Sequence, residues 1–284
     1  FVRLADDHFL VNSTSGGAAR IVAMMEEWLQ CEWRDLQVVI DDVTSQWANF
    51  TVAGPWSREV IEAIGTDLDL SAAALPHMSA AMGQVAGLDA RIVRVSFSGE
   101  MSYEINVPAA FANSFLRAIL EAGRPHGISP YGIEALMVLR LEKGYLHVGS
   151  DTDGSSTPDD VGWGHVARGN SGDYIGKRSL YREGNLDSTR KQLVGLEPLD
   201  SRQAMRPGGH LLIGPDREPP AETDGWVTSA CYSPTLDRHI ALAVLRSGRE
   251  REGEILTVCD ENQRFNVKVV PPVFYDPDNE RLRD

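Results

Sequence analysis

The stretch from Ser98 to Gly149 constrains the fold more than any other, because it places a strand pattern close to a helix pattern. Residues Met101–Val107 alternate apolar and polar side chains, which predicts a strand with two unlike faces. The apolar face holds Tyr103, Ile105 and Val107, and the polar face holds Ser102, Glu104 and Asn106. We expect this strand to form a hairpin with Arg91–Phe97, which precedes it.

The second half of the same stretch predicts a helix over Tyr131–Lys143, with Pro130 in its first turn and Gly144 as a left-handed C-terminal cap. Residues at helical spacing form one stripe: Ile133, Leu136, Met137, Arg140 and Leu141. Burying an unpaired guanidinium is costly, so Arg140 requires an anionic partner, either an internal carboxylate or a ligand. By pattern alone, Glu104 is a solvated carboxylate on the polar strand face.

Further elements are predicted nearer the start of the chain. Apolar residues at helical spacing in Ala18–Gln30 predict a helix that faces the core. Strands are predicted over Leu36–Ile40 and Trp47–Ala53. Because helices and antiparallel strands are mixed over the first two-thirds of the chain, we expect the α+β class rather than a doubly wound fold.

The last third of the chain has a different pattern. It holds short β-like runs separated by Gly and Pro, which is typical of a small all-β barrel or sandwich. These runs are Gln192–Leu196, His210–Ile213, Trp226–Tyr232, His239–Val244, Ile255–Val258 and Phe265–Val270. The hydrophilic segment before them predicts a domain boundary, with residues 1–189 in the first domain and residues 190–284 in the second.

Charge and cysteine content restrict the partners and the setting. The formal net charge of −14 argues against binding to nucleic acid or to an anionic membrane surface. No apolar run reaches the roughly 18 residues of a membrane helix, and the start carries no secretory signal pattern. The 3 cysteines are far apart and predict neither a metal site nor a disulfide framework, so we expect a reducing, cytoplasmic setting. Because the chain starts at Phe1 within a strand-like run, we also expect that N-terminal sequence is absent from it.

Motifs for chemistry are sparse. Asp151 and Asp153 resemble the start of a calcium loop, but the bidentate Glu is missing, so we interpret both as turn formers. The sequence holds no nucleophile–base signature and no dinucleotide fingerprint. The residues alone therefore predict an α+β protein with a β-rich C-terminal domain and one arginine in need of a partner.

Nine segments along the chain, in order, carry a resemblance to a known family. They are DHFLVNS, QWANFTVAGP, SFSGEMSYEINVP, YGIEALMVLRLEKG, SDTDGSSTPDDVGWG, DYIGKRSL, KQLVGL, GWVTSACYSPTL and IALAVLRSG. The chain resembles the aminomethyltransferase family, which includes the T-protein of the glycine cleavage system. Three variants, FSGEMSYEINVP, LRLEKGYLHVGSDTDG and PVFYDPDNERL, look most like the folate-binding C-terminal half of the alpha subunit of heterotetrameric sarcosine oxidase.

The resemblance implies an α+β body that binds tetrahydrofolate, followed by a C-terminal β-barrel. Carried over residue by residue, the pterin-binding glutamate of the family falls on Glu104 and its arginine on Arg140. The aromatic residue before the turn is Phe97, and Val11 and Ser13 match positions that border the folate. The catalytic aspartate of the family lies upstream of the segment that begins at Phe1, so no catalytic residue is assigned in this chain. No metal site is implied.

The resemblance also implies a reaction, the transfer of a one-carbon unit to tetrahydrofolate. In a sarcosine-oxidase-like system, the imine or formaldehyde derived from sarcosine would give 5,10-methylene-tetrahydrofolate. The partners implied are the other sarcosine oxidase subunits, and flavin and NAD would belong to other domains or subunits. Two alternatives remain open: a stand-alone T-protein or folate-dependent demethylase, and a non-catalytic module that holds folate or supports assembly.

Overall fold

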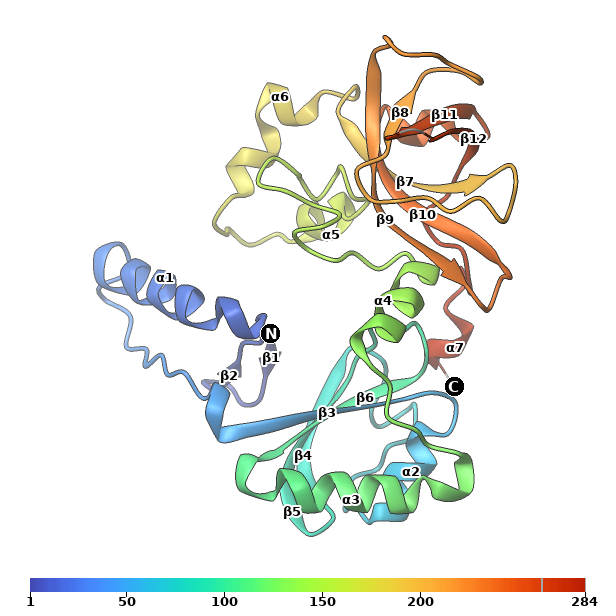
Figure 1. Cartoon of the computed structure of the whole chain (residues 1–284). Helices are drawn as coiled ribbons and strands as arrows, with labels where there is room; N and C mark the ends of the chain where they lie inside the picture. The colour runs from blue at the N-terminus through green and yellow to red at the C-terminus, as the bar shows by residue number, and fades with distance from the viewer. Residues whose placement is uncertain (262, 284) are drawn as a thin grey trace. The chain divides into compact units, whose positions relative to one another are not determined.

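The computed structural model describes residues 1–261 and 263–283, and its contacts divide the chain into two compact units (Figure 1). The first unit comprises Phe1–Ser96, Glu100–Pro130 and Asn279–Asp284, and the second comprises Phe97–Gly99 and Tyr131–Asp278. The contacts thus group residues 131–189 with the later strands, unlike the predicted division into 1–189 and 190–284. That domain division stays a prediction.

An antiparallel sheet forms the centre of the first unit. Its strands, in spatial order, are β3 (Trp47–Ala53), β6 (Ser102–Pro108), β5 (Leu88–Arg94) and β4 (Ser79–Val85). The predicted hairpin is present, because β5 and β6 pair antiparallel with Val93 opposite Glu104. Strand β3 pairs with the whole of β6, and β5 pairs with its residues 104–106, so β6 is a central strand of the sheet.

The helices α2 (Ser57–Ile64) and α3 (Ala112–Ala122) cover one face of this sheet (Figure 1). The predicted apolar face of β6 is the buried one, and Tyr103, Ile105 and Val107 are each fully buried. They pack in one cluster with side chains of both helices, including Ile61 and Phe115. Because successive strand residues point to opposite faces, the polar residues of β6 face away from these helices.

The N-terminal residues depart from two predictions. Leu36–Ile40 is not a strand, because no regular element lies between α1 (Ala18–Cys31) and the 3₁₀ turn at Thr44–Gln46. Helix α1 is present as predicted, yet none of its residues is buried within the described chain, so the core-facing interpretation was wrong. Helical spacing gives α1 an apolar side, but burial depends on a packing partner that local periodicity does not report. A short hairpin, β1 (Val2–Arg3) with β2 (Phe9–Leu10), precedes α1.

In the second unit, the predicted β-like runs form a closed barrel, which confirms the C-terminal barrel and the α+β class. Its strands, in spatial order, are β10 (Arg238–Arg246), β7 (Lys191–Pro198), β12 (Gln263–Val270), β11 (Ile255–Asp260), β8 (His210–Leu212) and β9 (Thr223–Ser233). Alternate residues of these strands fill the interior with apolar side chains such as Leu196, Val227 and Val267.

Helix α4 (Ile133–Glu142) packs on the outside of this barrel, where Leu141 contacts Leu193, Ile240 and Leu242. The remaining helices are α5 (Gly164–Gly169) and α6 (Glu183–Leu186) in the second unit and α7 (Glu280–Arg283) in the first. None of the helices in the described part of the chain has the length and apolar character needed to span a membrane.

Candidate functional site

The polar face of the sheet in the first unit carries Glu104, the predicted pterin-binding residue. In the register of the sheet, Glu104 lies between Thr51 of β3 and Val93 of β5. Two strands therefore flank Glu104, and its backbone position is fixed on both sides. A side chain on a central strand is held more rigidly than one on a loop, which suits a residue that orients a ligand.

The Glu104 carboxyl group is half-buried rather than solvated, contrary to the plain reading of its strand face. Burial raises the pKa of Glu104 above its ordinary value, and a hydrogen bond from the Asn49 side chain partly offsets this effect. Asn49 in turn accepts a hydrogen bond from Asn106 Nδ2 at 3.3 Å. The side-chain amides of Asn49 on β3 and Asn106 on β6 thus form a series of hydrogen bonds that orients the Glu104 carboxylate.

Further polar groups are buried on the same strands with part of their capacity unused. Arg91, opposite Asn106 in the register, is buried with its guanidinium carbon 3.7 Å from the centroid of the Trp47 ring. Burial lowers the pKa of Arg91. Within the described chain, Arg91 Nε and the Ser102 hydroxyl have no hydrogen-bond partner. Since buried polar groups are normally paired, unpaired donors beside Glu104 indicate a surface built to meet something polar.

Helix α4 carries the second predicted site residue, Arg140, and it ends as the sequence predicts. Gly144 has a left-handed φ of 72°. Its N–H donates to Leu141 O at 3.0 Å, and the Tyr145 N–H donates to Arg140 O at 2.8 Å. This pair of bonds is a Schellman cap. Only glycine fits this position, because an added Cβ would lie 2.3 Å from Pro272 O.

Replacing Gly144 with alanine should therefore lower the free energy of unfolding by about 2 kcal/mol, from the left-handed backbone together with the backbone clash. Gly162→Ala is the matched control, because Gly162 has a similar φ of 84° in the same unit with nothing within 4 Å. In urea unfolding, Gly162→Ala should lose only about 1 kcal/mol of unfolding free energy. Equal losses would show that the Pro272 contact has no role.

Arg140 is buried, and the chain itself supplies its anionic partner, which is the first of the two alternatives left open by the sequence. Its Nη1 donates to Asp151 Oδ2 at 2.6 Å and to Tyr145 O at 3.1 Å. Its Nη2 donates to Ser229 Oγ at 2.7 Å, and Ser229 Oγ donates onward to Asp151 Oδ1 at 2.6 Å. The pair therefore joins α4 to strand β9 of the barrel.

The residues that follow Arg140 are anchored in the same way. Glu142 accepts hydrogen bonds from Ser233 Oγ at 2.5 Å and Thr235 Oγ1 at 3.1 Å. Lys143 is 4% exposed and its Nζ lies 2.7 Å from Asp276 Oδ2. The segment Arg140–Lys143 thus buries three ionisable side chains, and each has a partner of matching chemistry. Its role within the second unit is to fix α4 against the barrel.

Asp151 corrects the turn-former interpretation. It is 1% exposed and accepts hydrogen bonds from the His147 N–H at 2.8 Å and Thr228 Oγ1 at 2.6 Å, besides those of the Arg140 network. Asp153 does form a turn, through bonds from the N–H and hydroxyl of Ser155 at 2.8 and 2.7 Å. The sequence signalled that a buried arginine requires a carboxylate, but both Asp151 and Asp153 follow Arg140 closely, so the pattern did not identify which of them is the partner.

The other predicted site residues lie in separate surroundings. In the second unit, the Phe97 ring lies nearly parallel to the Tyr145 ring, with centroids 6.3 Å apart. In the first unit, Val11 and Ser13 are exposed on the segment after β2. Within each unit, Glu104 gathers Asn49 and Asn106, and Arg140 gathers Asp151 and Ser229. The ligand roles of Glu104, Arg140, Phe97, Val11 and Ser13 stay predictions.

Sequence reasoning missed Asn49 and Arg91. The period-two pattern of Trp47–Ala53 puts Asn49 and Thr51 on one face, but only strand pairing brings that face to Glu104. Chemically, a carboxylate oriented by an amide can accept two N–H bonds from a flat heterocycle. Among the described residues, no group of three or more His, Cys, Asp or Glu side chains is arranged to hold a metal ion.

Comparisons with known families agree with this architecture. The family model "GCVT N-terminal domain" matches residues 1–170, and the model "Glycine cleavage T-protein C-terminal barrel domain" matches residues 191–276. A solved structure of the glycine cleavage system aminomethyltransferase T from Bartonella henselae superposes with a TM-score of 0.74 and 22% identity. It covers 93% of this chain and 67% of that chain. At this identity the likeness supports the fold alone.

Two curated relatives differ in how much of their length the chain covers. The sarcosine oxidase subunit alpha of Corynebacterium sp. (strain P-1) is 41% identical over 283 residues, which is 99% of this chain and 29% of that protein. The aminomethyltransferase of Desulfitobacterium hafniense (strain DSM 10664 / DCB-2) is 26% identical over 273 residues, which is 96% of this chain and 71% of that protein. The chain thus spans less than a third of the more similar relative.

Proposed function

The chain belongs to the glycine cleavage T-protein family, and on that premise we propose that it binds tetrahydrofolate and supports transfer of a one-carbon unit to it. We further propose that it does so within a sarcosine-oxidase-like protein, because that relative is 41% identical and the aminomethyltransferase is 26% identical. The one-carbon unit would come from sarcosine.

The observation that carries the proposal is the half-buried Glu104 carboxylate, oriented by Asn49 on a central strand. The pterin ring of folate presents adjacent N–H groups on its 2-aminopyrimidinone edge, and a carboxylate accepts such a pair in a charge-assisted, bidentate contact. Raising the pKa by burial makes the carboxylate a stronger acceptor for these donors. The unpaired Ser102 hydroxyl and Arg91 Nε of the neighbouring positions fit a polar ring system as well.

In this proposal the chain orients the folate, and the folate carries out the chemistry. Bound tetrahydrofolate supplies the amine nitrogens that accept the one-carbon unit. In this proposal Glu104 orients the pterin through its place on a central strand, and Phe97, Val11 and Ser13 border the ligand by resemblance to the family. Arg140 contributes by fixing α4 on the barrel through Asp151. A flavin and NAD would be bound by other domains or subunits of the same cytoplasmic protein.

Calorimetric titration of the chain with 5-formyl-tetrahydrofolate tests the proposal. We expect saturable binding with a dissociation constant in the micromolar range. The control ligand is 4-aminobenzoylglutamate, which keeps the tail of folate and lacks the pterin, and we expect it to bind at least tenfold more weakly. Equal binding of the two ligands would contradict recognition through the pterin, and absence of binding by the folded chain would contradict the proposal as a whole.

A further inference from the structure

A cavity of about 400 Å³ lies within the second unit, on the outer side of the barrel. Trp226, Val244 and Arg246 line it, and they alternate along β9 and β10 with residues that fill the barrel interior. The loop that begins at Gly149 and the segment from Gly184 to Lys191 form its walls. Its volume falls within the range of roughly 300–1,000 Å³ that small-molecule sites occupy.

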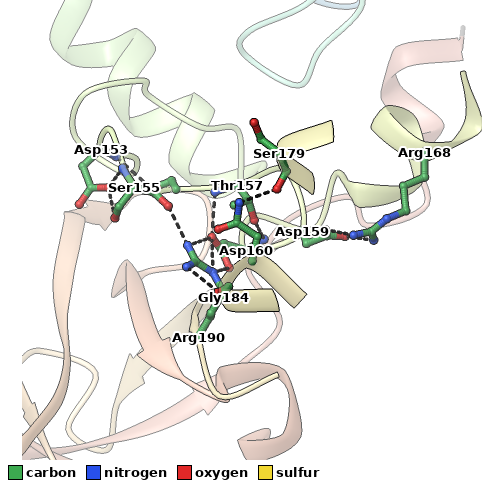
Figure 2. A network of polar contacts seen from close by, with 11 residues as sticks. Asp153, Ser155, Thr157, Asp159, Asp160, Arg168, Ser179, Gly184 and Arg190 are labelled. Atoms are coloured by element: carbon green, nitrogen blue, oxygen red, sulfur yellow. Dashed lines mark hydrogen bonds and ion pairs between the residues drawn. The ribbon is translucent and has the colours of Figure 1, made fainter. Parts of the chain in front are cut away.

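The walls are held in place by the chain alone, as Figure 2 shows. Arg190 Nη2 forms a salt bridge with Asp160 Oδ2 at 2.7 Å and also donates to Ser155 O at 2.7 Å. Its Nη1 donates to Gly184 O at 3.3 Å. One guanidinium therefore ties both wall segments together. A ligand would enter a preformed site and would not have to order these loops.

The carboxylates of the lining are already engaged. Those of Asp151, Asp153, Asp160 and Asp187 each accept hydrogen bonds from the chain. Asp153, for example, accepts from Ser155 and Ser156, and Asp187 accepts from the N–H and hydroxyl of Thr189. Acceptor groups in the lining are therefore largely committed to internal bonds. These four lining carboxylates therefore offer no unpaired acceptor to a ligand that requires one.

Two cations of the lining, Lys191 and Arg246, have fewer partners within the described part of the chain than these carboxylates. Lys191 and Arg246 lie directly opposite each other on the antiparallel strands β7 and β10, so two like charges share one face of the barrel. Lys191 Nζ lies 5.2 Å from the centroid of the Trp226 ring and has no carboxylate partner within the described chain. Arg246 has one ion pair, in which Nε lies 3.5 Å from Asp224 Oδ1, and its charge adds to the hydrogen bonds that chiefly lower the pKa of Asp187 in the lining. Like charges at opposed positions destabilise a strand pair unless anions compensate them, and here Arg246 has a carboxylate partner within the described chain whereas Lys191 has none.

We propose that this cavity binds a small organic acid, with its carboxylate between Lys191 and Arg246 and its apolar part against Trp226 and Val244. The opposed cations supply the donors that a carboxylate needs, and the indole and the valine supply an apolar surface beside them. The lining carboxylates disfavour a ligand of higher negative charge, so a monocarboxylate fits better than a phosphate. This site shares no residue with the Glu104 face, so a negative result for it would leave the proposed folate function unaffected.

Benzoate and benzamide form a matched pair of probes, because they share one shape and differ in charge. Calorimetric titration of the whole chain should show saturable binding of benzoate and at least tenfold weaker binding of benzamide, as expected for loss of a charge-assisted contact. Inorganic phosphate is the third probe, and we expect it to bind more weakly than benzoate. Equal affinity for benzoate and benzamide, no binding of benzoate, or preferred binding of phosphate would overturn the proposal.

Variants then assign the binding to the two cations. Lys191→Met and Arg246→Gln should each weaken benzoate about tenfold or more and leave benzamide unchanged. The controls are Lys268→Met and Arg249→Gln, which remove the same charges from exposed positions outside the lining. A purely structural role would lower the melting temperature in Lys191→Met without a selective loss of benzoate, and that result would overturn the assignment. We expect the melting temperature of Lys191→Met to be unchanged or higher, because the substitution removes one of the two opposed like charges.

Discussion

The Arg140→Met variant should lose about 3–5 kcal/mol of unfolding free energy, because it leaves the buried Asp151 carboxylate without its charge partner. Asp151 is 1% exposed, so water cannot replace the guanidinium without opening the contact between α4 and β9. The remaining donors are the His147 N–H and the hydroxyls of Thr228 and Ser229, which are neutral and do not balance the charge. Urea unfolding of the variant and the parent chain measures the loss.

Three further variants, Arg168→Met, Asp151→Asn and the double variant Arg140→Met/Asp151→Asn, separate this buried pair from ordinary ion pairs. Arg168→Met breaks the bidentate pair of Arg168 with Asp159, which is about one-third exposed, and should cost no more than about 1 kcal/mol. The double variant Arg140→Met/Asp151→Asn also removes the unpaired carboxylate charge. Its loss of unfolding free energy should therefore be smaller than the sum of the losses of the two single variants by at least about 1 kcal/mol. Additive losses, or a loss below about 1 kcal/mol in Arg140→Met, would contradict the anchoring role. Normal stability with weakened folate binding would instead support a direct ligand role for Arg140.

Glu104→Gln should weaken 5-formyl-tetrahydrofolate by about 2–4 kcal/mol, which is on the order of 30- to 1,000-fold in the dissociation constant. Glutamine keeps the size of the side chain but replaces one acceptor oxygen with a donor, which opposes the pterin N–H groups. Calorimetric titration compares the variant with Glu62→Gln, a control at an exposed position of α2 in the same unit. An affinity of Glu104→Gln within threefold of the parent would remove Glu104 from the site.

The raised pKa of Glu104 adds a dependence on pH with a definite sign. The folded chain binds the Glu104 proton more tightly than the unfolded chain, so Glu104 favours folding at low pH, and this contribution is lost as the pH rises through the folded pKa. Glu104→Gln should therefore not lower the free energy of unfolding at neutral pH. Folate affinity of the parent should decline as the pH falls through the raised pKa, since the neutral acid is a poorer acceptor, whereas Glu104→Gln should lack this decline.

The sequence predicted the strand and the helix that carry Glu104 and Arg140 better than it predicted the surroundings of these two side chains. Alternation along Met101–Val107 correctly placed Tyr103 and Ile105 in the core and Glu104 on the opposite face. It could not predict that Glu104 is half-buried, because that depends on strands that are distant in sequence. Thr51 of β3 and Val93 of β5 flank Glu104 only after the sheet has formed.

Arg140 shows the same limit for charge. Helix phase placed a guanidinium on an apolar stripe and indicated that it needs an anion if buried, and the anion is Asp151. The identity of the partner depends on how the chain reverses after Gly144, which brings the polar loop back to the helix. Pattern alone could not distinguish Asp151 from Asp153, although one is a buried ion-pair partner and the other forms a turn.

Helix α1 marks a third limit. Its apolar spacing predicted the helix correctly, and the stripe with Ile21 and Met25 is its less exposed side. Burial was predicted wrongly, because the core of the first unit is filled by α2 and α3. Spacing reports which side of a helix is apolar, and only the tertiary packing decides whether that side is covered.

The central claim is that the chain holds tetrahydrofolate through Glu104, and a crystal structure of the chain with 5-formyl-tetrahydrofolate tests it most directly. The quantity to measure is the distance from the Glu104 carboxylate oxygens to the N3 and 2-amino nitrogens of the pterin. Our account predicts two contacts of about 2.7–2.9 Å, as in other charge-assisted pairs. A folate bound in the crystal with its pterin beyond hydrogen-bonding distance of Glu104 would contradict the account.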